Sequence, residues 1–359
     1  MKVALVYDRV NKWGGAERVI IALRKIFPES DLFTSVYEKN RASWANKINV
    51  IPSFLQKIPL ASRYHEAFAL FMPIAFESFN FDKYDLVISV TSESGKGIIT
   101  KPKTRHISVI LTPTRYLWSG YKNYFPNELF RILAWPAVSY LRFWDKIAAK
   151  RPDQLIAISR TVQNRVKKYY DLESKIVYPP LMMRFARNFP QLASGKVPRS
   201  DYFLIVSRLV PYKRVDIAIK AANKLKIPLK IIGEGSEYPR LRKMAGKTVE
   251  FLGYVSDPDL KYYYMNCKAL LFPGVEDFGL TIVEANAAGK PVIAYRGGGA
   301  EEIIIEGKTG EFFDSQTAAS LTEVLKKFKP NRYNTRACKL NANRFSFERF
   351  RENFLKLVE

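Results

Sequence analysis

The chain has 359 residues, enough for two domains, because a single hydrophobic core rarely grows beyond about 250–300 residues. It carries 58 Lys and Arg against 34 Asp and Glu, and the net charge of +24 favours anionic partners such as nucleotides, nucleic acid or anionic lipid. Two widely separated cysteines and only two histidines disfavour a disulfide framework and a metal site.

The amino-terminal residues MKVALVYDRV predict a buried strand over residues 3–7 and lack the apolar segment and cleavage site of a signal peptide. No apolar run reaches the ~20 residues that a membrane-spanning helix needs. We therefore expect a cytoplasmic protein that does not cross the membrane. The loop NKWGGAE then leads into a helix, and Gly14 and Gly15 at this turn would let a ligand approach the backbone closely. For a glycine pair taken alone, a plain tight turn is the more common explanation.

Residues 51–80 are rich in aromatic side chains, and prolines divide them into short helices or loops. Two interpretations stay open for this segment. It could be an interfacial patch that meets anionic lipid, or a hydrophobic surface packed under the rest of the domain.

Further strands are expected over residues 85–90 and 153–158, and a helix rich in aromatics and arginines over 125–149. The basic helix expected over 161–170 is more typical of a solvated face than of a nucleic-acid site. Pro179 and Pro180 end the first domain, and a polar connection containing Pro190, Gly195 and Pro198 leads to the second.

The second domain begins with a strand over residues 202–206, followed by SRLVPYKR. Arg208 lies at the strand end and Lys213 just before the next helix, so two cations can neutralise a pyrophosphate at the carboxyl edge of a sheet. Two later strands end at glycines. Gly233 follows the strand over 229–232, and the next strand ends at Gly253, Tyr254 and Val255.

Residues 271–302 carry the clearest signal. A strand end turns into a loop with Glu276 and Asp277, and a helix runs from Leu280 until Gly289 ends it. In a parallel α/β sheet such a loop lies where ligands collect. The helix amino terminus suits a phosphate, and carboxylates suit sugar hydroxyls. We expect Glu276 and Glu284 to face one crevice, which predicts a nucleotide-sugar site.

The wording EDFGLTIVEANAAGKPVIAYRGGGAEEII resembles the Glu-x7-Glu signature of retaining glycosyltransferases of the GT-B fold, the "glycosyl transferases group 1" (GT4) family. It looks closest to the O-antigen mannosyltransferase branch, and GGAERV and SRL…KR also match family motifs. The resemblance implies an α/β fold of two Rossmann-like domains facing an interdomain cleft. Residues 1–180 would bind the acceptor and residues 200–344 the nucleotide-sugar donor, with a terminal helix over 345–359 packing back on the first domain.

The resemblance also implies residue roles. Glu276 would bind sugar hydroxyls and Glu284 the ribose, while Arg208 and Lys213 would stabilise the leaving diphosphate in place of a metal. Glu276, Arg208 and Lys213 are thus the expected catalytic residues. The full set of expected donor-binding residues is Gly14, Gly15, Arg208, Lys213, Gly233, Gly253, Tyr254, Val255, Glu276, Asp277, Phe278, Gly279, Leu280 and Glu284. Arg115, Tyr116 and Trp118 would line the cleft on the acceptor side.

One position departs from the family pattern. Leu111 stands where relatives have a histidine that contacts the donor sugar, and His106 is expected to be structural. The expected activity is hexose transfer, best fitted by GDP-mannose, to a lipid-linked or membrane-presented glycan, with no cofactor, no metal and no nucleic acid. The enzyme would lie on the inner face of the membrane. The alternatives are a UDP-sugar transferase, a GT-B sugar-nucleotide epimerase or hydrolase, and a non-catalytic binder of nucleotide sugars or polyanions.

Overall fold

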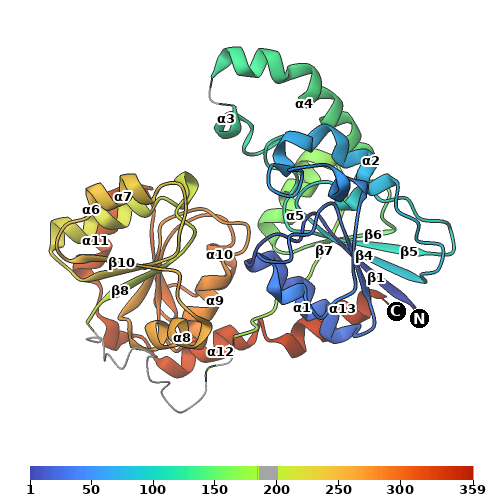
Figure 1. The fold of residues 1–359 in the computed structure, drawn as a ribbon. Coiled ribbons are helices and arrows are strands. Elements are labelled where there is room, and N and C mark those ends of the chain that lie inside the picture. Colours follow the sequence, from blue (N-terminus) through green and yellow to red (C-terminus); the bar gives the residue numbers. More distant parts are fainter. Residues whose placement is uncertain (126, 184, 186–200, 359) are drawn as a thin grey trace. The chain divides into compact units, whose positions relative to one another are not determined.

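The computed structural model describes residues 1–125, 127–183, 185 and 201–358. The chain divides into two α/β units (Figure 1). Unit 1 comprises Met1–Pro180 and Phe350–Glu359, and unit 2 comprises Leu181–Arg349. The predicted connection around Pro190, Gly195 and Pro198 lies outside the described residues.

Unit 1 is built on a parallel sheet. Its strands are β1 (Val3–Tyr7), β2 (Asp31–Thr34), β3 (Val50–Pro52), β4 (Leu86–Thr91), β5 (Arg105–Ile110), β6 (Gln154–Ala157) and β7 (Lys175–Ile176). Their order is β3-β2-β1-β4-β5-β6-β7, and every pairing is parallel. The order reverses between β1 and β4, and ligands of such sheets bind beyond the strand ends at this kind of switch point.

The helices of unit 1 follow the expected periodicity. They are α1 (Gly15–Ile26), α2 (Met72–Glu77), α3 (Tyr121–Tyr124), α4 (Glu128–Ala148) and α5 (Arg160–Tyr170), with 3-10 turns η1 (Ser43–Ala45), η2 (Phe54–Lys57), η3 (His65–Phe71) and η4 (Gly95–Gly97). The last helix, α13 (Phe347–Val358), carries Phe354, whose ring packs against Phe27 at 6.5 Å. The Arg105 guanidinium donates to the Leu357 carbonyl at 2.8 Å and so holds the end of α13 beside β5.

Some residues of the segment over 51–80 are buried and others are exposed, so each of the two interpretations fits a part of it. Leu55, Met72 and Phe76 are buried in a core that includes strand residues of the sheet. Leu70 and Phe71, in contrast, lie on the surface. The packed surface is therefore real, and a separate set of apolar side chains from the same segment faces solvent.

Unit 2 repeats the architecture with a second parallel sheet. Its strands are β8 (Phe203–Val206), β9 (Leu229–Ile232), β10 (Val249–Gly253), β11 (Ala269–Phe272), β12 (Val292–Tyr295) and β13 (Gly310–Phe313). The order is β10-β9-β8-β11-β12-β13, so the switch point lies between β8 and β11. Its helices are η5 (Pro211–Lys213), α6 (Val215–Leu225), α7 (Tyr238–Met244), α8 (Asp257–Asn266), α9 (Leu280–Ala287), α10 (Ala300–Ile303), α11 (Ala318–Lys327), η6 (Pro330–Arg332) and α12 (Thr335–Asn343).

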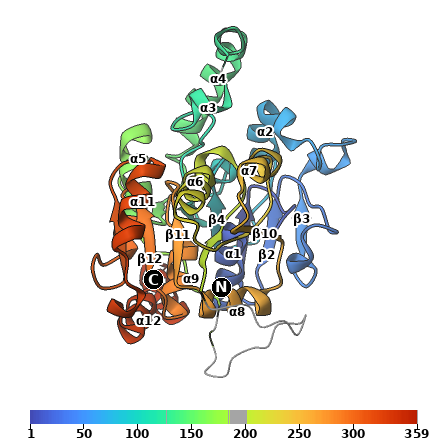
Figure 2. The same cartoon turned by 90° about the vertical axis from the view of Figure 1, so that its left-hand side faces the viewer.

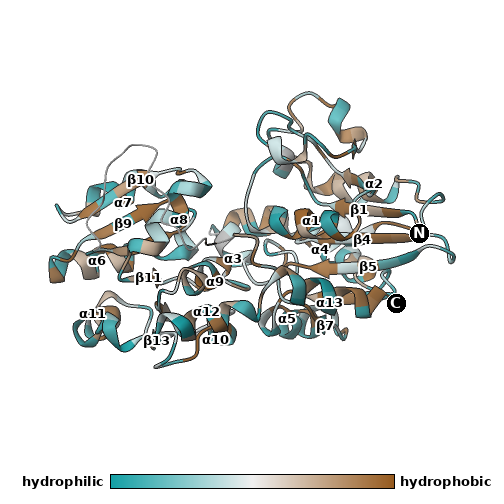
Figure 3. Cartoon of the chain, turned by 90° about the horizontal axis from the view of Figure 1, so that it is seen from below, coloured by the Kyte–Doolittle hydropathy of each residue, from teal (hydrophilic) through white to brown (hydrophobic). Residues whose placement is uncertain are grey.

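Hydrophobic strands form the interior of both units (Figure 3). The inner strands are short and mostly buried, as in a parallel sheet covered by helices, whereas the edge strands β3, β7 and β10 are more exposed. Both cysteines are buried, and burial raises the pKa of the Cys267 thiol to about 12. Within the described residues, none of the helices combines the length and the apolar character that crossing a membrane requires.

Candidate functional site

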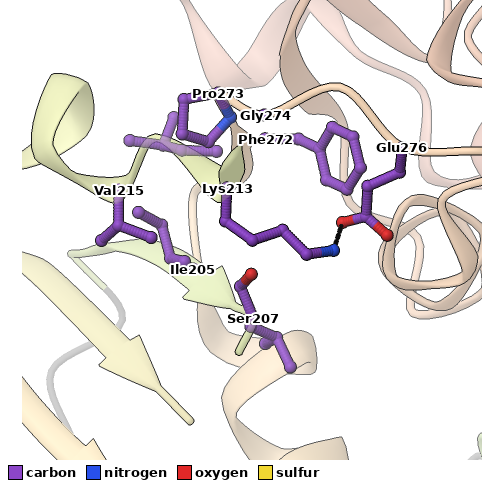
Figure 4. A pocket seen from close by; sticks show the side chains of 10 residues that line it. Ile205, Ser207, Lys213, Val215, Phe272, Pro273, Gly274 and Glu276 are labelled. Atoms are coloured by element: carbon purple, nitrogen blue, oxygen red, sulfur yellow. Dashed lines mark ion pairs between the residues drawn. The ribbon is translucent and has the colours of Figure 1, made fainter. Parts of the chain in front are cut away.

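The switch point of unit 2 brings together the loops that follow β8 and β11. Lys213 ends η5 on the first loop, and Glu276 lies on the second. Their ammonium and carboxylate groups form an ion pair, and both side chains are mostly buried (Figure 4). The pair borders a hollow of about 10 Å³, room for about one water molecule. The hollow is lined by Ile205, Val206, Ser207, Lys213, Val215, Leu271, Phe272, Pro273, Gly274 and Glu276.

Glycines bring these loops into contact. A Cβ at Gly274 would lie 2.8 Å from the Cα of Lys213, so only glycine lets the β11 loop approach η5 this closely. On the other side of the loop, the Gly299 N–H donates to the Glu276 carbonyl at 2.9 Å. Gly298 has a φ of +65°, and a Cβ there would meet the same carbonyl at 2.4 Å. The triple-glycine loop therefore fixes the backbone that carries Glu276.

A second cation lies on the same loop as Lys213. The exposed Arg208 guanidinium donates to the Tyr212 hydroxyl at 2.6 Å. The Lys213 ammonium lies 5.4 Å from the centre of the Tyr212 ring. Tyr212 thus contacts both cations. The sequence did not single out this residue, because it lies inside a motif whose charges alone suggested a function.

The structure gives Gly233 a packing role. Its φ is +129°, and a Cβ there would lie 2.0 Å from the Ser207 carbonyl. Its N–H donates to the Gly253 carbonyl at 2.8 Å, which ties the ends of β9 and β10 together. Tyr254, beyond β10, is 76% exposed, and Val255 is partly buried. Contacts of these residues with a donor remain predictions.

Glu284 lies in different surroundings from Glu276. It is 2% exposed on α9, and it is absent from the residues that line the hollow. The fully buried Tyr264 of α8 donates its hydroxyl to Glu284 Oε2 at 2.8 Å. Tyr264 belongs to a run of three tyrosines, and its buried side is decided by how α8 packs, so the sequence carried no signal for this contact.

Between the two glutamates, backbone N–H groups rather than side chains are available to bind a ligand. Asp277 and Phe278 are buried, and the Phe278 ring packs against Phe345 at 5.4 Å. Gly279 caps α9 with a φ of +102°, and no side chain of the described residues caps the first turn, which begins at Leu280. The positive end of the α9 dipole is therefore presented by backbone N–H groups, a suitable arrangement for an anion.

In unit 1, Gly14 caps α1 and Gly15 is its first residue. The expected acceptor residues Arg115, Tyr116 and Trp118 follow β5, and each is partly buried. Burial raises the pKa of the Tyr116 hydroxyl, with smaller contributions from nearby carboxylates. The roles of these five residues toward donor and acceptor remain predictions.

Trp118 belongs to a buried polar network around Asp145 that the sequence analysis missed. Asp145 accepts from the Lys96 ammonium at 2.5 Å, the Thr114 hydroxyl at 3.0 Å and the Trp118 indole at 2.7 Å. The Tyr170 hydroxyl also donates to it, at 2.8 Å. Lys96 and Asp145 come from distant elements, and both are almost completely buried, so their charges compensate each other inside the unit.

The switch point of unit 1 carries a second charged group. Asp8, just after β1, accepts from the Thr91 hydroxyl at 2.7 Å and the Gly95 N–H at 2.9 Å. Beside it, the Arg9 guanidinium donates to both oxygens of Glu93, at 2.6 and 3.0 Å. Burial raises the pKa of the Glu93 carboxyl, although Arg9 opposes the shift and Asp8 adds to it. The unit thus holds fixed charge at the strand ends where ligands of such sheets bind.

Two further residues of unit 1 concern the departure from the family pattern. Leu111 follows β5, and its N–H donates to the Thr91 carbonyl at 2.8 Å. His106 is buried within β5, and its Nε2 lies 2.9 Å from the Ser89 hydroxyl. Burial lowers the pKa of His106 to about 3, with a smaller contribution from Arg151, so the ring is neutral and packed inside the sheet.

Sequence comparison finds a family model that matches the part of the chain that carries the Lys213–Glu276 pair. Residues 191–345 match the family model "Glycosyl transferases group 1". An uncharacterized glycosyltransferase of Methanocaldococcus jannaschii is 29% identical over 187 residues, 51% of this chain and 51% of the relative. A GDP-mannose-dependent alpha-(1-6)-phosphatidylinositol monomannoside mannosyltransferase of Mycolicibacterium smegmatis is 32% identical over 33% of this chain and 35% of its own. The matches thus span about a third to a half of these relatives.

Comparison of folds covers the whole chain. The Anabaena protein HepE, solved in complex with UDP, matches 100% of this chain and 99% of its own with a TM-score of 0.72 at 17% identity. At this identity the likeness establishes the fold, the GT-B architecture of two Rossmann-like domains, and the predicted fold class is confirmed. The O-antigen mannosyltransferase branch stays a prediction at these identities. Among the described residues, no group of three or more His, Cys, Asp or Glu side chains could hold a metal ion.

Proposed function

We propose that this protein is a nucleotide-sugar-dependent glycosyltransferase that retains the configuration of the transferred sugar and works without a metal. The observation that carries the proposal is the mostly buried Lys213–Glu276 pair at the switch point of unit 2. It combines a cation for the diphosphate with a carboxylate for sugar hydroxyls, near the start of α9, where no side chain of the described residues caps the first turn. The family match over residues 191–345 supports the glycosyltransferase part of this proposal.

Donor binding would break this pair by exchange. A donor phosphate replaces the Glu276 carboxylate at the Lys213 ammonium, and a sugar hydroxyl then takes the place of the ammonium at Glu276. Because the two side chains are held together before binding, neither buried charge is left uncompensated in the empty protein. Arg208, held by Tyr212, adds a second cation on the same loop.

In the proposed reaction, the bond between the anomeric carbon and the leaving diphosphate oxygen breaks. The acceptor hydroxyl oxygen forms its new bond on the same face of that carbon, and its proton passes to the departing diphosphate. Negative charge grows on the diphosphate as the bond breaks. We expect Lys213, Arg208 and the N–H groups at the start of α9 to stabilise that charge. Electrostatic stabilisation of this kind is usually the largest single contribution to catalysis.

The donor we propose is GDP-mannose. The wording from Glu276 to Tyr295 resembles mannosyltransferases, and the matched mycobacterial relative is a GDP-mannose-dependent enzyme. The alternative is a UDP-sugar, which HepE in complex with UDP supports. The exposed Tyr254 beyond β10 is the side chain that we propose to stack on the base.

We further propose a lipid-linked or membrane-presented glycan as the acceptor, in the synthesis of a cell-surface polysaccharide such as lipopolysaccharide. The protein would work in the cytoplasm, peripherally on the inner face of the membrane. The net charge of +24 supports an anionic surface as the working location. The exposed apolar side chains of unit 1 support the same location.

Calorimetric titration with GDP, UDP and ADP, with EDTA present, tests the donor site. We expect GDP to bind selectively, and Arg208→Ala to weaken binding at least about tenfold, since a charge-assisted hydrogen bond contributes about 1.5–3 kcal/mol. Arg332→Ala, an exposed arginine on η6, is the matched control and should bind like the wild type. Preference for UDP would discard mannose but keep the transferase. Equal weak binding that disappears with salt would instead identify a non-catalytic polyanion binder.

A further inference from the structure

Helix α4 has two apolar faces. One face packs into unit 1 through Val138, Leu141 and Trp144. The opposite face carries a row of large apolar side chains, each between 42% and 70% exposed. We name this row the outer stripe, and its members are Leu129, Ile132, Leu133, Tyr140, Phe143 and Ile147. Their spacing of three, four and seven residues places them on one side of the helix.

The outer stripe is most prominent at the amino-terminal end of α4. The buried residues of the helix begin at Val138, so its first ten residues have none. Phe130 and Trp135 add further apolar area there, at 65% and 64% exposure. Figures 1 and 2 both show this end of α4, with α3, extending beyond the sheet of unit 1. A solvent-facing helix surface is normally polar, and a continuous apolar surface of this kind marks an interaction site.

Positive charge surrounds the outer stripe. Residues 119–151 contain six Lys and Arg against two Asp and Glu. Of these acids, Asp145 is buried in its pair with Lys96, and Glu128 is paired with Arg131 at 3.3 Å. Lys146 and Lys150 remain exposed at the carboxyl-terminal end. The surface therefore presents apolar side chains bordered by cations, which complements a layer with an apolar interior and anionic headgroups.

A hollow between α3 and α4 has the same mixed character. It measures about 290 Å³ and is lined by Tyr121, Arg131, Ile132 and Trp135. Its wall is almost entirely apolar, and the charged Arg131 also lines it. A lipid offers both groups that such a hollow accommodates, an acyl segment for the rings and a phosphate for Arg131.

We propose that the outer stripe of α4 docks the protein on an anionic lipid bilayer, with the helix lying in the interface and its cations among the phosphates. The proposal rests on the proposed function, because a membrane-presented acceptor requires the enzyme to be held at the bilayer. A second copy of the chain is a poorer occupant, since it would bring the same cations and two molecules of +24 together. The docking element differs from the segment over residues 51–80 that the sequence analysis considered.

Sedimentation of the full chain with vesicles tests this proposal. The vesicles are phosphatidylcholine alone or phosphatidylcholine with phosphatidylglycerol. We expect binding to the mixed vesicles, and a decrease of about tenfold or more in the partition coefficient for the double variant Ile132→Ser/Leu133→Ser. Leu340→Ser, which removes an equally aliphatic side chain that is 58% exposed on α12, is the matched control and should bind like the wild type. Lys146→Gln/Lys150→Gln should reduce only the preference for the anionic vesicles.

Three results would overturn the proposal. The wild type could fail to sediment with the mixed vesicles, or the double variant could bind them as tightly as the wild type. Sedimentation velocity without vesicles could instead reveal a dimer that Ile132→Ser/Leu133→Ser dissociates, which would make the stripe an interface between copies. Urea unfolding of the double variant followed by tryptophan fluorescence, expected to match the wild type, shows that unit 1 is folded, because all five tryptophans lie in that unit. Vesicle binding of Arg208→Ala separates the two proposals, because failure of the donor site leaves it unchanged.

Discussion

The contact between Tyr264 and Glu284 allows a sharp test, because a single atom can be removed. Tyr264→Phe deletes the hydroxyl that donates to Glu284 Oε2 at 2.8 Å and keeps the ring in its buried place. A hydrogen bond to a charged group contributes about 1.5–3 kcal/mol, and the buried carboxylate cannot turn to bulk water for a replacement. We therefore expect the free energy of unfolding of unit 2 to fall by about 1.5–3 kcal/mol.

The same substitution should weaken donor binding. The hydroxyl holds one oxygen of Glu284 and so orients the carboxylate that we propose to bind the ribose. With that orientation lost, we expect the affinity for the nucleoside diphosphate to fall about three- to tenfold, or about 0.7–1.4 kcal/mol. Tyr202→Phe is the control, since Tyr202 is also a buried residue and its hydroxyl donates to the neutral Tyr263 carbonyl at 2.9 Å. It should cost about 0.5–1.5 kcal/mol of stability and leave donor affinity unchanged.

The assay can separate the two units because all five tryptophans lie before residue 150, in unit 1. Tryptophan fluorescence in a urea titration therefore follows unit 1, while far-UV circular dichroism follows both units. For Tyr264→Phe we expect only the dichroism transition to shift. Unchanged stability together with unchanged nucleotide affinity would refute the reasoning. Equal losses in Tyr264→Phe and Tyr202→Phe would show that the charge of Glu284 adds nothing.

Two further predictions concern unit 1, and both are read from tryptophan fluorescence in urea. Asp145→Ala leaves the buried Lys96 ammonium without its carboxylate and should lower the free energy of unfolding by about 3–5 kcal/mol. The control Asp82→Ala breaks an exposed pair with Lys101 and should lower it by less than about 1 kcal/mol. Similar losses in the two variants would contradict the burial argument. Burial lowers the pKa of His106 from 6.5 to about 3, so the neutral ring stabilises the fold above pH 6.5, and that stability is lost as the pH falls toward 3. Between about pH 7.5 and about pH 5 the wild type should lose about 2 kcal/mol more than His106→Asn, and parallel pH profiles would refute this.

Much of the fold could be predicted from local pattern. Apolar runs such as residues 3–7 and 229–232 become strands β1 and β9, and the run after Gly279 becomes helix α9. The sequence also indicated that Lys213 and Glu276 both follow strands. Both were therefore expected at the carboxyl ends of the strands of a parallel sheet. These inferences succeed because strand and helix periodicity and glycine turns are properties of neighbouring residues.

The tertiary structure alone decided which of these residues meet. Lys213 reaches Glu276 because β8 and β11 are neighbours and Gly274 lets their loops touch, whereas the Glu284 carboxylate accepts a hydrogen bond from Tyr264. The Lys96–Asp145 pair joins residues that are 49 positions apart in the sequence, and no local sequence pattern predicts it.

The same holds for α4. Its apolar residues occur on both sides, so the sequence determined a helix and a hydrophobic surface without determining which side is covered. Only packing against unit 1 leaves the outer stripe in solvent. Local periodicity follows from the geometry of one element, while contact and exposure depend on the pairing of elements distant in the chain.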